Sequence, residues 1–222
     1  MDRRDFIKFG AAAVLGFCAS IPKLVFADKD FEAEVKKLIE GNERFIKGEF
    51  KHRDSSAAKL GELSKGQHPF AVVVSCSDSR VDPEIVFDKD LGEIFVVRTA
   101  GNVVDKIALG SIEYAVEHLH SPIVVVVGHE SCGAVKATLE AKGKVHGNIG
   151  AIVDKIVPAA ASARKKTKAG EDVLYNAIIE NIKLVTKEIS TKSPIIAKEL
   201  KEGKVNVLGA YYSISTGKVT RV

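Results

Sequence analysis

The stretch Phe70-Ala71-Val72-Val73-Val74-Ser75-Cys76-Ser77-Asp78-Ser79-Arg80 joins an apolar, β-branched run directly to a polar segment. An unbroken run of this kind is typical of a strand buried on both faces, as in a parallel sheet. Similar runs occur at 94–97 and 123–127, and helical periodicity at 107–119 lies between them. Strands that alternate with helices predict an α/β fold with a mostly parallel central sheet.

The second half of the chain continues this alternation. Periodicity predicts three further helices at 134–141, 151–164 and 173–189. The run at 205–212 predicts another strand, and Ser215-Thr216-Gly217 predicts a turn into a short terminal strand at 218–221. We therefore expect the sheet to end in an antiparallel edge strand, with helices on both faces.

An amphipathic segment at 30–50 precedes the predicted sheet. Its apolar residues recur at helical spacing among lysines and glutamates, which predicts one or two helices with one buried face. We expect this N-terminal helical arm to dock on another surface. A lysine-rich stretch at 164–168 is expected to be a solvated loop between two helices. Residues 28–222 are expected to form a single domain.

The composition excludes several classes of protein. With 222 residues, 45% of them hydrophobic and 28% charged, the chain is neither disordered nor fibrous. Its 33 basic and 29 acidic residues leave a net charge of +4, so no large basic field favours binding to nucleic acid. Three cysteines are too few for a disulfide scaffold, and an odd number leaves at least one of them unpaired.

Residues 1–27 have the pattern of an export signal. A charged start is followed by the apolar run 9–21, which as a helix is about 20 Å long and shorter than the ~30 Å hydrocarbon core. This favours a cleaved signal peptide over a membrane span. The Arg3-Arg4-Asp5-Phe6-Ile7-Lys8 string resembles a twin-arginine signal, which predicts a periplasmic protein exported after folding. Membrane contact is expected only during export.

Cleavage of this signal is predicted after Ala27, where a small residue precedes Asp28. The cut removes Cys18 and leaves two cysteines in the mature domain. Cys18 could instead accept a lipid, but Phe17 before it is bulky where such sites take a small residue.

Metal-ligating side chains follow two of the predicted strands. Cys76 and Asp78 come directly after the first strand, and His129 and Cys132 follow the third. Because the carboxyl ends of parallel strands meet at one edge of a sheet, we expect these residues to converge. Two thiolates and an imidazole select Zn²⁺ over Mg²⁺ or Ca²⁺. The pattern therefore predicts one zinc ion per subunit on Cys76, His129 and Cys132.

The fourth position on the zinc decides the function. If Asp78 fills it, the site is closed, whereas a water molecule there makes the site catalytic. Arg80 favours the second arrangement, because a guanidinium two residues away can hold the Asp78 carboxylate off the metal in a bidentate pair. Asp78 would then orient a zinc-bound hydroxide. Two thiolate ligands predict activity favoured at mildly alkaline pH.

Other interpretations of these residues are structural. Cys76 and Cys132 could form a disulfide or lie in the core as inert thiols. A thiol redox role is disfavoured because neither belongs to a Cys-x-x-Cys pair. The remaining histidines have no such neighbours in the sequence, and no proton shuttle is assigned among them: His52, His68, His118, His120 and His146.

The mature chain resembles the β-class carbonic anhydrases. The resemblance rests on four motifs in the family's order: Cys76-Ser77-Asp78-Ser79-Arg80-Val81, Val97-Arg98-Thr99-Ala100-Gly101-Asn102, Ile112-Glu113-Tyr114-Ala115 and Gly128-His129-Glu130-Ser131-Cys132-Gly133. It implies zinc on Cys76, His129 and Cys132, an orienting dyad of Asp78 and Arg80, and reversible hydration of CO₂ to bicarbonate and a proton. Related proteins with the same site hydrolyse CS₂ or COS, and a non-catalytic zinc protein is the other alternative.

The resemblance also implies a small apolar substrate pocket built across a dimer interface. Gln67, Phe95 and Tyr114 occupy the matching positions, although Phe95 could equally be a packing residue. The 30–50 arm is then expected to pack on the partner subunit, in a homodimer or a dimer of dimers. Some family members bind bicarbonate with a tryptophan and pull the aspartate onto zinc. Here Val73 replaces the tryptophan while Arg98 remains, so we expect Asp78 to stay paired with Arg80.

Overall fold

The computed structural model of the chain describes residues 31–222. The predicted export signal at 1–27, with Cys18 and the cleavage position after Ala27, lies outside the described residues. None of the helices in residues 31–222 combines the length and the apolar character that a bilayer crossing requires.

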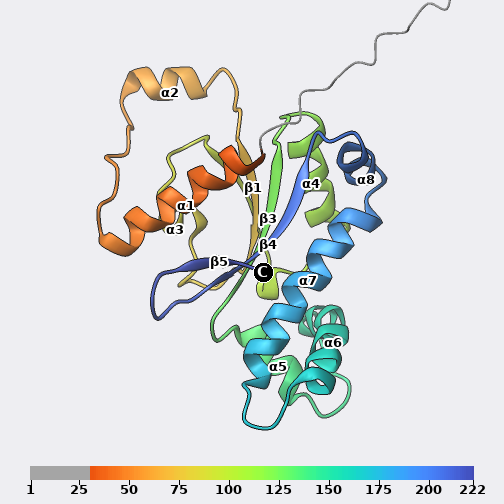
Figure 1. Cartoon of the computed structure of the whole chain (residues 1–222). Helices are drawn as coiled ribbons and strands as arrows, with labels where there is room; N and C mark the ends of the chain where they lie inside the picture. The colour runs from red at the N-terminus through yellow and green to blue at the C-terminus, as the bar shows by residue number, and fades with distance from the viewer. Residues whose placement is uncertain (1–30) are drawn as a thin grey trace, which may run out of the picture.

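Within the described residues, five strands form one sheet in the order β2-β1-β3-β4-β5 (Figure 1). They are β1 (Ala71–Ser75), β2 (Ile94–Arg98), β3 (Ile123–His129), β4 (Asn206–Tyr212) and β5 (Val219–Arg221). Neighbouring strands are parallel except for β4 and β5, which form an antiparallel pair. The predicted α/β fold, with its antiparallel edge strand, is confirmed.

The helices occupy most of the remaining described residues. They are α1 (Phe31–Lys47), α2 (Ala57–Leu63), α3 (Pro83–Val86), α4 (Lys106–Glu117), α5 (Gly133–Glu140), α6 (Ile149–Lys166), α7 (Val173–Lys192) and α8 (Pro194–Lys201), with a 3₁₀ turn, η1, at Ala100–Asn102. The sequence pattern missed α2, α3 and α8. Helices α2 and α3 have only seven and four residues, and α2 buries none of them, so neither shows a clear helical period, whereas α8 could have been predicted. Ser193 before Pro194 was a usable start signal for α8, since it caps the helix through Ile196 N.

The lysine-rich stretch at 164–168 is only partly a loop. Helix α6 continues through Lys166, so the first three residues of the predicted loop are helical, although they are exposed. Lysine and arginine are good helix formers, and their charge is favourable in the last turn of a helix. The prediction of a loop beginning at Arg164 was therefore wrong.

Each central strand is buried on both faces, which explains the unbroken apolar runs. Along β1, Val72 and Val74 contribute to one core, and Ala71 and Val73 to the other. The first core is covered by α4, α5, α6, α7 and α8, and the second by α1 and α3. Successive residues of a strand point to opposite faces, so a strand between two cores needs apolar residues at every position.

The strand order places a topological switch point between β1 and β3. The chain passes from β1 to β2 on one side and then returns to β3 on the other side of β1. Crevices outside the carboxyl ends of strands at such a point are the usual ligand sites of open α/β sheets. The Cys76 and His129 segments leave the sheet here.

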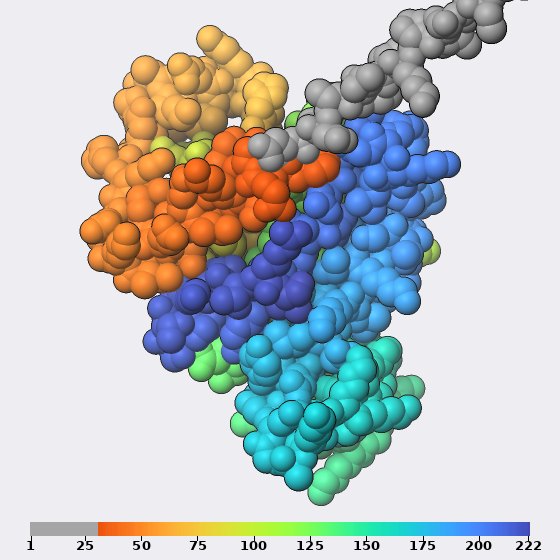
Figure 2. Space-filling model, in the orientation of Figure 1, coloured from red at the N-terminus to blue at the C-terminus, as the bar shows by residue number. Residues whose placement is uncertain are grey.

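Within one chain, α1 packs on the chain's own sheet, and packing of the 30–50 arm on a partner subunit stays a prediction. Leu38 is buried in the same core as Val73 and Val125. Asn42 donates to the carbonyl of Gly217 at 2.8 Å and accepts from Val219 N at 2.8 Å. Figure 2 shows α1 and the β4–β5 hairpin lying against each other on this face. Periodicity identified the buried face of the helix but not the surface that covers it.

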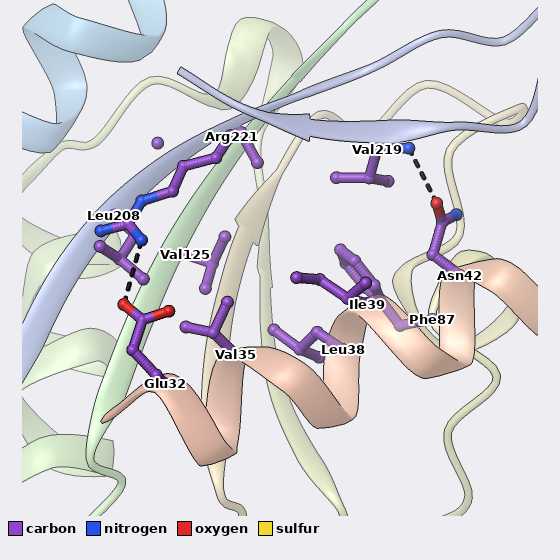
Figure 3. A pocket seen from close by; sticks show the side chains of 12 residues that line it. Glu32, Val35, Leu38, Ile39, Asn42, Phe87, Val125, Leu208, Val219 and Arg221 are labelled. Atoms are coloured by element: carbon purple, nitrogen blue, oxygen red, sulfur yellow. Dashed lines mark hydrogen bonds and ion pairs between the residues drawn. The ribbon is translucent and has the colours of Figure 1, made fainter. Parts of the chain in front are cut away.

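A cavity of about 190 Å³ remains between α1 and the sheet. Figure 3 shows Val35, Leu38 and Ile39 of α1 facing Val125 and Leu208 across it. An ion pair between Glu32 and Arg221, 3.1 Å long and exposed, lies at one end, and the Asn42–Val219 hydrogen bond lies at the other. The cavity is thus apolar within and bordered by polar links between α1 and β5.

We predict that Gly41→Ala loosens α1. A Cβ at Gly41 would lie 1.7 Å from the carbonyl oxygen of Phe87, a backbone atom that cannot rotate away. Overpacking of this kind should lower the free energy of unfolding by about 1–3 kcal/mol, as measured by urea denaturation. Gly61→Ala in α2 is the matched control, because its Cβ would meet nothing within 4 Å and alanine favours a helix by about 0.5–1 kcal/mol. Equal stability of the two variants would contradict the prediction.

Candidate metal centre

Cys76, His129 and Cys132 converge at the switch point. Cys76 is the first residue after β1, His129 is the last residue of β3, and Cys132 immediately precedes α5. Their ligand atoms all lie within 4.8 Å of one another. The three residues are buried, with exposed fractions of 5%, 0% and 1%. Both cysteines are free thiols, so the alternative of a disulfide between them is not realised.

The His129 ring is oriented for metal binding. Its Nδ1 lies 2.9 Å from the carbonyl oxygen of Glu130. Because a carbonyl can only accept, Nδ1 carries the hydrogen, and the Nε2 lone pair is left free. Among residues 31–222, Nε2 is buried and has no hydrogen-bond partner. A buried polar atom without a partner is unfavourable, and a cation beside two thiols would satisfy it. The residues therefore fit a zinc ion.

The two thiols share their protons unequally. A hydrogen bond from the Cys132 thiol lowers the pKa of Cys76, against the effect of burial, and the hydrogen bond from the Gly101 N–H lowers it further. The same hydrogen bond to Cys76, together with burial, raises the pKa of Cys132. Cys76 is therefore the first of the pair to become a thiolate. A divalent cation would have to displace the remaining proton when it binds.

Asp78 and Arg80 form a two-pronged ion pair beside the cluster. Arg80 Nε lies 2.9 Å from Oδ1 of Asp78, and Nη2 lies 2.8 Å from Oδ2. The backbone N–H of Arg80 also donates to Oδ1, at 3.0 Å. Arg80 thereby holds the pKa of Asp78 well below its usual range, so this carboxyl is ionised. Its Oδ2 lies 3.9 Å from His129 Nε2, beyond hydrogen-bond range but facing the cluster.

Arg98 fixes the loop that carries these residues. Its Nε donates to the carbonyl oxygen of Cys76 at 3.0 Å, and its Nη2 donates to that of Asp78 at 2.7 Å. Val73, which the resemblance places where some family members have a tryptophan, is fully buried in the core on the α1 side. Arg98 is thus tied to the backbone of the site.

Two further residues hold the metal-ligating segments, and the sequence analysis did not assign them this role. The N–H of Gly101 donates to Cys76 Sγ at 3.2 Å. The Glu130 carboxylate accepts hydrogen bonds from Ser213 Oγ at 3.0 Å and Ser215 N at 2.8 Å, which ties the β4–β5 turn to the residue after His129. Gly101 and Glu130 lie within two of the motifs quoted for the family resemblance. No rule of sequence spacing, however, predicts that a glycine N–H faces a sulfur atom 25 positions away.

The residues predicted to line the substrate pocket do not gather at the cluster within one chain. Phe95 and Tyr114 contact each other, with ring centroids 6.4 Å apart. Phe95 is partly buried and packs against the core, in agreement with its other interpretation as a packing residue. Gln67 precedes the amino end of β1, whereas Cys76 follows its carboxyl end, and a strand of this length spans about 16 Å.

The five other histidines lie on the surface of the described region, as expected from their lack of ligating neighbours. All of them are exposed: His52, His68, His118, His120 and His146.

Comparisons with known proteins agree with this fold. Residues 71–219 match the family model described as carbonic anhydrase. A carbonic anhydrase of Mycolicibacterium smegmatis is 41% identical over 187 residues, covering 83% of this chain and 89% of the relative. Carbonic anhydrase 2 of Mycobacterium tuberculosis is 38% identical, covering 82% and 88%.

Solved structures extend the likeness to three dimensions. The β-carbonic anhydrase CcaA superposes with a TM-score of 0.66 and 31% identity, covering 85% of this chain and 87% of that one. The Coccomyxa β-carbonic anhydrase, solved with acetazolamide, gives a TM-score of 0.69 and 26% identity, covering 86% and 84%. On the extent of these matches and the shared fold, the chain belongs to the β-class carbonic anhydrase family and is a carbonic anhydrase, a carbonate dehydratase.

Proposed function

We propose that Cys76, His129 and Cys132 hold one Zn²⁺ per chain and that the protein combines CO₂ with water to give bicarbonate and a proton, in a reversible reaction. The main observation that supports the zinc site is the buried Nε2 of His129. This atom lies beside two thiols and has no hydrogen-bond partner among residues 31–222. When bound, zinc supplies Lewis-acid chemistry that lowers the pKa of a water molecule toward neutrality.

Asp78 orients the reacting water in this proposal. Its carboxylate is ionised and faces the cluster, so it accepts a hydrogen bond from the water and leaves an oxygen lone pair directed at the carbon of CO₂. Arg80 keeps the carboxylate in place through both of its oxygens. With Asp78 held this way, its carboxylate would not close the metal site, which would stay open to solvent.

A partner subunit completes the substrate pocket in the same proposal. Tyr114 is 48% exposed and Ile107, also on α4, is 79% exposed, so this helix presents apolar surface to solvent. None of the seven residues of α2, all of them described, is buried, and Leu60 on it is 48% exposed. Apolar surface of this extent favours association of two chains. Gln67, Phe95 and Tyr114 of one chain would then lie at the cluster of the other.

Removal of the metal tests the proposed chemistry directly. We predict that the purified protein contains one zinc per chain by elemental analysis. Chelation should abolish CO₂ hydration in a stopped-flow assay with a pH indicator, and added Zn²⁺ should restore it. Cys76→Ala should bind no stoichiometric metal and show no activity, because two ligands do not form a stable tetrahedral site. Activity on COS but not on CO₂ would replace the proposed substrate, and a metal-bound protein active on neither would identify a structural site.

We predict that Asp78→Asn lowers kcat/KM for CO₂ hydration by about 10- to 100-fold while the zinc content is unchanged, because an orienting group is lost and no ligand is. Asp172→Asn is the matched control. Asp172 caps α7 through Leu174 N and Tyr175 N, and asparagine caps a helix equally well, so its activity should equal that of the wild type. Full activity in Asp78→Asn, or an X-ray absorption spectrum with a carboxylate ligand near pH 8.5, would refute the role of Asp78.

Light scattering after gel filtration should show the mature chain as a dimer or a dimer of dimers. Gln67→Ala should lower kcat/KM without changing the zinc content, although Gln67 and Cys76 lie at opposite ends of β1 in one chain. A fully active monomer would contradict the shared pocket.

A further inference from the structure

Asn181 is a buried polar residue that the proposed mechanism does not use. It lies on α7 on the same helix face as Ile178, Ile182 and Val185, and its exposed fraction is 1%. An amide among aliphatic side chains is unfavourable unless it is hydrogen-bonded, so its presence calls for a specific partner. Its Nδ2 donates to the carbonyl oxygen of Gly101 at 2.9 Å. In the described part of the chain, its Oδ1 has no hydrogen-bond partner.

Gly101 is the residue whose N–H donates to Cys76 Sγ, at 3.2 Å. Its φ of 68° lies in the left-handed region, which favours glycine. A Cβ at this position would lie 2.7 Å from Ile156 Cδ1 and 3.1 Å from Ala134 Cβ, so the loop is also held by its neighbours. The Asn181 hydrogen bond holds the peptide after Gly101, and the hydrogen bond to sulfur uses the peptide before it. The two contacts therefore fix the two sides of one residue.

Close packing of helix α7 against the sheet holds the Asn181 amide in place. It packs against β3 at Gly128, where a Cβ would lie 2.6 Å from Ile182 Cγ1. Gly128 immediately precedes His129. Helix α7 therefore contacts both the strand that carries His129 and, through Asn181, the Gly101 turn that donates to Cys76. A shift of Asn181 would move the Gly101 N–H relative to the sulfur atom.

We propose that Asn181 is a positioning residue that holds the Gly101 N–H on the Cys76 sulfur and thereby sets how strongly this thiolate donates to the cation. The inference rests on the proposed metal site. A hydrogen bond to a thiolate withdraws electron density from the sulfur, and groups hydrogen-bonded to metal ligands tune the metal in this way. With two thiolates in the ligand set, a weaker donor at Cys76 leaves the cation more electrophilic.

The experiment uses the mature protein loaded with Co²⁺ in place of zinc, because thiolate-to-cobalt charge-transfer absorption reports electron density on the sulfur. Asn181→Leu removes the amide at similar volume, and Asn181→Asp keeps the shape but removes the N–H donors. Both should move the charge-transfer band to lower energy. In the zinc forms, kcat should fall about tenfold, with KM unchanged. If one variant does not fold, the other provides the same measurements.

Asn42→Leu is the matched control. Asn42 is also a buried asparagine, 4% exposed, that donates to backbone carbonyls, those of Val86 and Gly217. It lies on α1, over the opposite face of the sheet from α7. Its replacement should lower the free energy of unfolding but leave the cobalt spectrum unchanged.

The outcomes separate this inference from the proposed function. A charge-transfer band in Asn181→Leu or Asn181→Asp identical to that of the wild type would overturn the role of Asn181, and the metal site would stand. Equal shifts in the Asn181 and Asn42 variants would also overturn it, because they would indicate general loosening. A wild-type protein that binds Co²⁺ without charge-transfer absorption would instead refute the thiolate site itself.

Discussion

The parallel pairing of β1 with β3 is the constraint on which the rest of the structure depends. Ser75 pairs with Val127 in this register, so the residue after one strand and the last residue of the other come to the same edge of the sheet. Cys76 and His129 are thereby brought together from distant parts of the sequence. A change of register by one residue would reverse the faces of every side chain in β3, exchanging its two cores. Burial of both faces therefore fixes the site as well as the fold.

Burial also determines the chemistry of the cluster. A neutral imidazole and two thiols in an apolar surrounding are stable only if each polar atom has a partner. The protein supplies partners for two of these groups: the Glu130 carbonyl accepts from His129 Nδ1, and the Gly101 N–H donates to Cys76 Sγ. The atoms that remain, Nε2 and the sulfur lone pairs, face one another. The fold thus brings together unpaired nitrogen and sulfur atoms that can act as ligands of a divalent cation such as Zn²⁺.

The N-terminal arm shows how one pattern can fit two different surfaces. The amphipathic face of α1 required a covering surface, and both the chain's own sheet and a partner subunit would meet that requirement. The hydrogen bonds of Asn42 to Val86 and Gly217, and the burial of Leu38, show that part of this face packs on the chain's own sheet. These contacts join residues up to 175 positions apart, which no local periodicity can encode. In the proposed dimer, the exposed α2 and α4 surfaces would contribute to the association.

The sequence by itself determined the alternation of strands and helices, the antiparallel edge strand, and the identity of Cys76, His129 and Cys132 as a potential metal set. Each of these depends on local signals: apolar runs, helical periodicity, turn residues, and ligating residues placed directly after strands. The tertiary structure alone decided where α1 docks, which nitrogen of His129 is free, and that Gly101 and Asn181 lie behind Cys76. Those features depend on packing and hydrogen bonds between residues far apart in the chain, where the geometry of the whole fold sets which atoms meet.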